Sequence, residues 1–156
     1  MKTINPREVY RSLISLHVML CVITSLLIGS IYTYKNQSSQ PMSSDNIWYE
    51  LIIPLLALIT FLISHFLGKK KYKLITPKIQ LIEQLLIYKQ VKIIQWTSLM
   101  GSAILAAVSF FITSQQNLIL YSMMLGVMML YFRPIKSKII EDLNLSPDHA
   151  RVLDSD

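Results

Sequence analysis

The sequence predicts an all-α protein, an integral membrane bundle of four helices with both termini in the cytoplasm. Apolar residues make up 53% of the 156 residues and charged residues only 15%, whereas about 25% of the residues in an average soluble domain are charged. The charges border uncharged stretches, and a membrane-spanning helix needs about 20 predominantly apolar residues. The length suits a single domain with short connections between the spans.

Four spans are predicted in order along the chain, at about residues 12–32, 47–67, 93–113 and 118–132. The first helix should begin before its span, because Asn5 is a good N-cap and Pro6 suits the first helical position. The fourth span is short, and Arg133 can extend its reach by snorkelling. Only residues 114–117 separate the last two spans, which predicts an antiparallel helical hairpin.

The basic residues fix the expected orientation. Three precede the first span, seven lie between the second and third, and four follow the fourth, so 14 of the 15 share one side and only Lys35 lies on the other. Cytoplasmic loops are enriched in Lys and Arg, so both termini and the long connection are predicted to be cytoplasmic. The net charge of +6 follows from this placement. Nucleic acid is not expected as a partner, because no groove-reading motif is present.

Two polar segments are expected on the cytoplasmic side. Apolar residues recur at helical spacing between residues 76 and 92, which predicts an amphipathic helix. It lies on the membrane surface with its lysines near anionic lipid, or it extends the third span and docks on the tail. The tail, residues 133–156, begins around a helix-ending proline, Pro134. A short helix is expected to start at Pro147, with Ser146 as its cap.

Ionisable groups within spans are costly and are therefore candidates for function. His17 and His65 lie at similar depths near the inner boundary, and Cys21 follows His17 by one helical turn. Histidine and cysteine can ligate a metal or haem, although hydrogen bonding to neighbours or head groups is the simpler explanation. Glu50 begins the second span and is a candidate ion site or a solvated helix-terminal carboxylate. Gln95 can hydrogen-bond between helices.

Small residues at four-residue spacing predict helix packing, because they let helices approach closely in lipid. The residues concerned in the third and fourth spans are Ser98, Gly101, Ser102, Ala106, Ser122 and Gly126.

The tail carries the pattern Arg-Pro-x-Lys-x-Lys-Ile-x-x-Asp-Leu-Asn-Leu-Ser from Arg133 to Ser146. With Ile4-Asn5-Pro6 near the start, it resembles an uncharacterised family of small bacterial four-pass inner-membrane proteins, sometimes labelled transporters. The resemblance implies a bacterial inner membrane and four spans, and it implies no activity. An acidic residue often precedes the family's counterpart of Gly101, whereas Met100 stands there in this chain.

These patterns favour a non-enzymatic structural or accessory subunit of an inner-membrane complex, with membrane lipid and other subunits or further copies of the chain as partners. No catalytic motif or cofactor is predicted. A small oligomeric transporter of an ion or solute is the alternative. A haem- or metal-binding redox subunit is the third hypothesis, and it depends on His17, Cys21 and His65 alone.

Overall fold

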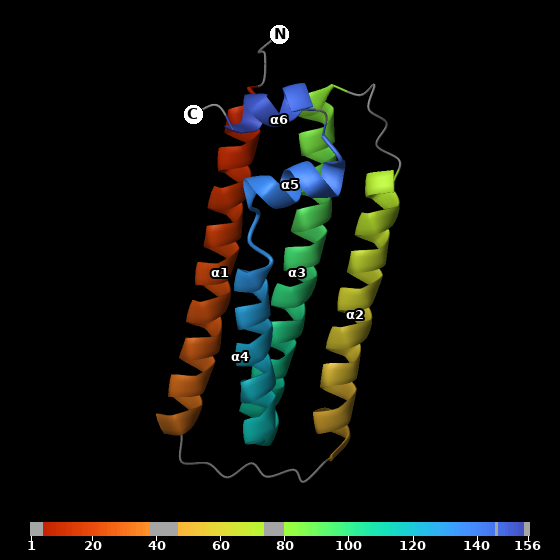
Figure 1. Cartoon of the computed structure of the whole chain (residues 1–156). Helices are drawn as coiled ribbons and strands as arrows, with labels where there is room; N and C mark the ends of the chain where they lie inside the picture. Colours follow the sequence, from red (N-terminus) through yellow and green to blue (C-terminus); the bar gives the residue numbers. More distant parts are fainter. Residues whose placement is uncertain (1–4, 38–46, 74–79, 146, 155–156) are drawn as a thin grey trace.

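The structure is a computed structural model that describes residues 5–37, 47–73, 80–145 and 147–154. The helices in these ranges are α1 (Pro6–Gln37), α2 (Ile47–Lys73), α3 (Leu81–Thr113), α4 (Gln116–Tyr131), α5 (Lys136–Leu143) and α6 (Pro147–Asp154). The first four run side by side, and α5 crosses one end of the bundle with α6 beyond it (Figure 1). That end, which also holds the first turn of α1, is called the tail end. The opposite end, at the α3–α4 connection, is called the loop end.

Helices α1, α2 and α3 are each long and apolar enough to cross a membrane. Helix α4 has 16 residues and qualifies only together with α5, to which it is bent by 79°. The chain is therefore a multi-pass membrane protein with three to four candidate spans. The predicted all-α bundle is confirmed at this level.

Several helix boundaries differ from the prediction. Helix α3 begins at Leu81, and residues 81–92 are its first turns. Of the two alternatives for residues 76–92, the structure therefore shows the extension of the third span and not a separate surface helix. Residues 76–79 lie outside the described part. The helix continues without a break into the predicted span at Ile93, because Lys92 and Ile93 tolerate helical geometry and no proline or glycine is near.

Capping hydrogen bonds define the start of α1 and the end of α3. The backbone N–H of Arg7 donates to Asn5 Oδ1 at 3.0 Å, which confirms Asn5 as the cap of α1. At the loop end, Ser114 adopts a left-handed conformation with φ of 61°, and its N–H donates to the Phe110 carbonyl at 2.8 Å. This αL cap turns the chain within two residues, so the α3–α4 link is shorter than predicted.

Helix α3 is the centre of the bundle, because it packs extensively against α1, α2 and α4. Helices α1 and α2 have almost no contact with each other and lie on opposite sides of the α3–α4 pair (Figure 1). Helix α2 also contacts α4 only weakly. Where α2 meets α3, Gly68 permits the approach, because a Cβ there would lie 2.7 Å from Val91 Cγ1.

The buried apolar residues form two clusters, one toward each end of the bundle. The tail-end core contains large side chains from α1, α3, α4 and α5, including Tyr88, Trp96 and Ile139. The loop-end core contains the small residues Ala103, Ala106 and Ala107, together with larger side chains such as Phe110 and Leu118. Helix α5 therefore belongs to the same folded unit as the bundle, since Ile139 and Leu143 are buried in the tail-end core.

Candidate functional site

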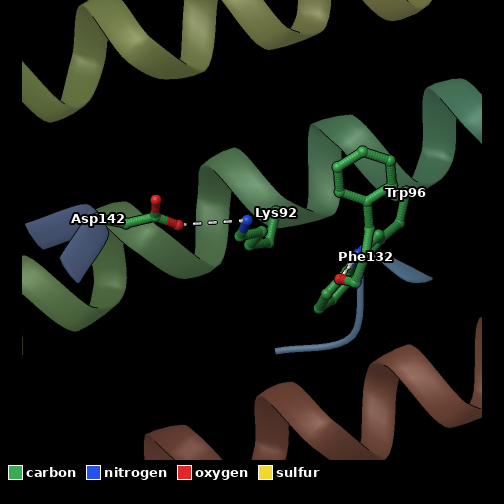
Figure 2. Close-up of polar contacts among 4 residues, drawn as sticks. All are labelled: Lys92, Trp96, Phe132 and Asp142. Carbon is green, nitrogen blue, oxygen red and sulfur yellow. Dashed lines mark hydrogen bonds and ion pairs between the residues drawn. The ribbon is translucent and has the colours of Figure 1, made fainter. Parts of the chain in front are cut away.

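An ion pair joins α3 to α5 at the tail end. Lys92 Nζ lies 3.5 Å from Asp142 Oδ2, as Figure 2 shows. The Lys92 side chain is 10% exposed, whereas that of Asp142 is 37% exposed. The ammonium group also lies over the Tyr88 ring, 5.0 Å from its centroid. Lys92 is thus a nearly buried cation held by one carboxylate and one aromatic face.

Lys92 lies just outside the hydrocarbon core. Helix α3 has 33 residues and is about 50 Å long at 1.5 Å per residue, whereas the hydrocarbon is about 30 Å thick. The excess falls at the tail end, because residues 81–92 carry Glu83, Lys89 and Lys92 and residues 93–113 carry no charge. Burial in protein lowers the pKa of Lys92, and the Asp142 carboxylate opposes this effect in part.

A hydrogen bond fixes the chain where it leaves α4. Trp96 is fully buried, and its indole Nε1–H donates to the Phe132 carbonyl at 3.2 Å (Figure 2). Phe132 is the C-cap of α4, and Pro134 follows it and is buried. The bond satisfies a carbonyl at the helix end and directs the chain into α5. Trp96 therefore positions the tail.

A charged cleft of about 220 Å³ opens beside the ion pair. It lies between the ends of α2 and α3, the turn after α4, and α5. Its lining residues are His65, Lys69, Tyr72, Lys92, Gln95, Phe132, Arg133, Lys138, Glu141 and Asp142. We call it the cationic cleft, since four basic residues face two carboxylates there.

The charges in the cationic cleft do not cancel. With the Lys92–Asp142 pair set aside, Lys69, Arg133 and Lys138 remain against Glu141. Lys138 Nζ also lies 4.9 Å from the centroid of the Tyr131 ring. The Tyr72 hydroxyl is buried and has no hydrogen-bond partner among the described residues. The cleft therefore carries excess positive charge, which is the chemistry of an anion site.

An apolar pocket of about 140 Å³ lies further along the same side of the bundle, between α2 and α4 with α3 behind it. Its lining includes Pro54, Leu58 and Phe61 of α2, Leu99 of α3, and Met124 of α4. The Phe61 ring lies 5.4 Å from that of Phe132 and 6.1 Å from that of His65, measured between centroids. Because Phe132 and His65 line the cationic cleft, the pocket and the cleft are adjacent. Together they are called the α2–α4 groove.

The three candidate metal ligands do not converge. The His17 ring packs on Trp96 with centroids 4.6 Å apart, and Cys21 Sγ lies 3.7 Å from His17 Nε2. His65 is on α2, where its ring contacts Phe61 and Phe66. The two histidines are kept apart because α3 separates their helices. Within the described residues, no group of three or more His, Cys, Asp or Glu side chains forms a metal site.

The two candidate polar residues have different settings. Glu50 is in the first turn of α2, and its side chain lies outside the described part. Gln95 is buried between α3 and α2, where its Nε2 would lie 3.0 Å from a Cβ at Gly68. Its Oε1 has no hydrogen-bond partner among the described side chains and backbone groups. Gln95 is also one of the residues that line the cationic cleft.

The small residues selected from the sequence fall into two groups. Ser102 and Ser122 are buried and form hydrogen bonds across helices, with Oγ of Ser102 3.2 Å from Thr60 Oγ1 and Oγ of Ser122 2.7 Å from the Ala103 carbonyl oxygen. Ala106 is fully buried in the loop-end core.

The remaining small residues have different surroundings. A Cβ at Gly126 would lie 3.9 Å from Ile28, and Ser98 is partly buried with its hydroxyl unpartnered within the described chain. Gly101 faces outward, and a Cβ there would have no atom of another helix within 4 Å. No other helix of this bundle therefore packs closely against Gly101.

Comparisons with known protein families, curated proteins and solved structures find no match. Function must therefore be inferred from the geometry. Sequence reasoning missed the cationic cleft, although the Lys and Asp of the tail pattern, Lys138 and Asp142, are two of its residues. The signal was an acidic residue in a basic tail, which needs a cationic partner once the tail is buried.

Proposed function

We propose that the chain is a non-enzymatic accessory subunit of a bacterial inner-membrane complex, with its tail end in the cytoplasm. The orientation is supported by the 14 basic residues on that side. The resemblance of the Arg133–Ser146 pattern to small bacterial four-pass proteins supports the location.

The observation that carries the proposal is a set of small residues that are exposed on the outside of the bundle, where they form surfaces suited to close packing of another helix. On α1, Ser25, Gly29 and Thr33 are exposed at four-residue spacing, and a Cβ at Gly29 would have no atom of another helix within 4 Å. Gly101 on α3 is exposed in the same way. A helical glycine is about 1 kcal/mol less favourable than alanine. A packing partner outside the bundle would account for both glycines, since glycine allows close helix approach in lipid.

Purification from native membranes in mild detergent tests the proposal. We expect a larger membrane protein to co-purify in stoichiometric amount, and Gly29→Leu to release it while the subunit stays folded. Leu27→Phe is the matched control, because Leu27 is exposed on a different face of α1. Recovery of the chain free of partners, or equal release by both variants, would contradict an accessory role.

A small oligomeric transporter is the competing function. Its test is solute flux in proteoliposomes, with Glu50→Gln and His65→Ala as variants. Flux that either variant abolishes would replace the accessory role with transport. An absorption spectrum and metal analysis of the same purified sample address the redox hypothesis for His17, Cys21 and His65.

A further inference from the structure

We propose that the α2–α4 groove binds one anionic phospholipid, with its phosphate in the cationic cleft and an acyl chain in the apolar pocket. The proposal goes beyond the accessory role and does not depend on it. Lipid contacts every exposed face of a membrane protein, so the distinguishing claim is selectivity for a negatively charged headgroup at this one place.

The charge of the cleft suits a phosphodiester. Lys69 and Arg133 are exposed and come from different segments, one at the end of α2 and one after α4. Because both residues line a single cleft, their positive charges repel each other unless an anion lies between them. Basic residues between helices at the membrane surface are a recurrent feature of anionic-lipid sites.

Two polar side chains of the cleft can serve the same ligand. Tyr72 and Gln95 line it, and the Tyr72 hydroxyl and Gln95 Oε1 are buried without a hydrogen-bond partner in the described structure. Neither atom reaches a ligand until its side chain turns toward the cleft. Once turned, the hydroxyl can donate to a phosphate oxygen and the amide oxygen can accept from a headgroup hydroxyl.

The dimensions of the groove match one leaflet of the bilayer. Pro54 at the deep end and His65 at the cleft are 11 residues apart on α2, which is about 17 Å at 1.5 Å per residue. Half of the hydrocarbon thickness is about 15 Å. Lys69 directly follows the apolar part of α2 and therefore lies at headgroup level. A lipid whose phosphate is in the cleft thus places its acyl chain beside Leu58 and Met124.

Native mass spectrometry of the full chain in detergent tests the proposal, with phosphatidylglycerol and phosphatidylcholine of identical acyl chains as probes. We expect phosphatidylglycerol to be retained preferentially. Lys69→Gln with Arg133→Gln should weaken its binding roughly tenfold to thirtyfold, at about 1 kcal/mol for each basic residue. Lys70→Gln with Lys71→Gln removes the same charge from residues outside the cleft and should change binding by less than about threefold.

Two further measurements distinguish binding of a lipid from binding of a free anion. Met124→Trp fills the apolar pocket and should weaken binding of both lipids, whereas Met123→Trp, whose side chain lies outside that pocket, should not. Excess inorganic phosphate should fail to displace phosphatidylglycerol. Equal retention of the two lipids, equal losses in the two lysine variants, or displacement by phosphate would each overturn the proposal. Thermal unfolding of every variant verifies that it is folded.

Discussion

The two halves of α3 are held by different means. Toward the tail end, Tyr88 and Trp96 bury large aromatic side chains, and polar bonds from α3 fix the tail. Toward the loop end, Ala103 and Ala106 are fully buried, and Ser122 donates across to the Ala103 carbonyl. One continuous helix therefore buries mainly large side chains toward the tail end and several small ones, beside Phe110, toward the loop end.

The difference follows from the two solvents that α3 meets. Outside the hydrocarbon and at its edge, where Trp96 lies one helical turn beyond Lys92, removing apolar area from water stabilises the fold by about 25 cal/mol per Å², so large side chains contribute most. Inside it, lipid is as apolar as the protein, and association relies on close packing and interhelical hydrogen bonds. The tail-end core should therefore be sensitive to loss of volume, and the loop-end core to added volume.

The largest expected effect is in the tail-end core. Trp96→Ala should lower the free energy of unfolding by about 3–5 kcal/mol, because it opens a cavity in a fully buried site and removes the bond to Phe132. Thermal and denaturant unfolding in detergent measure it. Trp48→Ala is the control, since Trp48 is 64% exposed. Similar losses for the two variants would show that the tail end has no tightly packed core.

Added volume should break the loop-end core. Ala106→Leu should cost about 1–3 kcal/mol, because it forces α3 away from its neighbours. Val108→Leu adds one methylene group at an exposed position of the same helix and should be nearly neutral. The same unfolding measurement compares them. If Ala106→Leu were as well tolerated as Val108→Leu, the close-packing account of this half would be wrong.

The ion pair is expected to have a smaller effect. Asp142→Asn should destabilise the fold by about 1–2 kcal/mol, because Lys92 is left nearly buried without its counter-charge and Asp142 is itself partly exposed. The double variant Lys92→Met with Asp142→Leu should recover most of the loss, since replacing both partners by apolar groups is often neutral. A double variant as unstable as the single one would indicate that the pair is needed for packing rather than for charge balance.

The smallest effect is expected for the interhelical hydroxyl. Ser122→Ala should lower stability by about 0.6 kcal/mol, the average for interhelical hydrogen bonds in lipid. Ser25→Ala is its control, because Ser25 is exposed on α1. A loss above about 2 kcal/mol would mean that hydrogen bonding, rather than close packing, dominates the loop end.

Sequence reasoning identified the apolar helices because hydropathy and charge placement are local properties. It could not decide between a surface helix and an extension of α3 for residues 81–92, because the same helical periodicity buries a face against lipid or against protein. Leu85 and Tyr88 are buried in the tail-end core, which also contains Ile139 of α5. No local feature of the sequence indicates that these distant segments share one core.

The site was less accessible to sequence reasoning than the fold. The cationic cleft joins Lys69 and Arg133 through the turn between α4 and α5, and the 79° bend there depends on tertiary packing. A metal or haem site that uses both His17 and His65 would require α1 and α2 to be neighbours. Helix α3 instead packs extensively against α1, α2 and α4, and α1 and α2 lie on opposite sides of it.

Thiol labelling along α3 tests most directly the proposal that this helix passes from a water-exposed cytoplasmic segment, residues 81–92, into lipid. In a Cys21→Ser background, exposed positions are replaced by cysteine and treated with a membrane-impermeant reagent. We predict that Glu83→Cys and Gln90→Cys react only after the membrane is permeabilised, and that Leu105→Cys and Val108→Cys never react. Labelling at residue 105, or labelling at residue 83 in intact cells, would contradict the account.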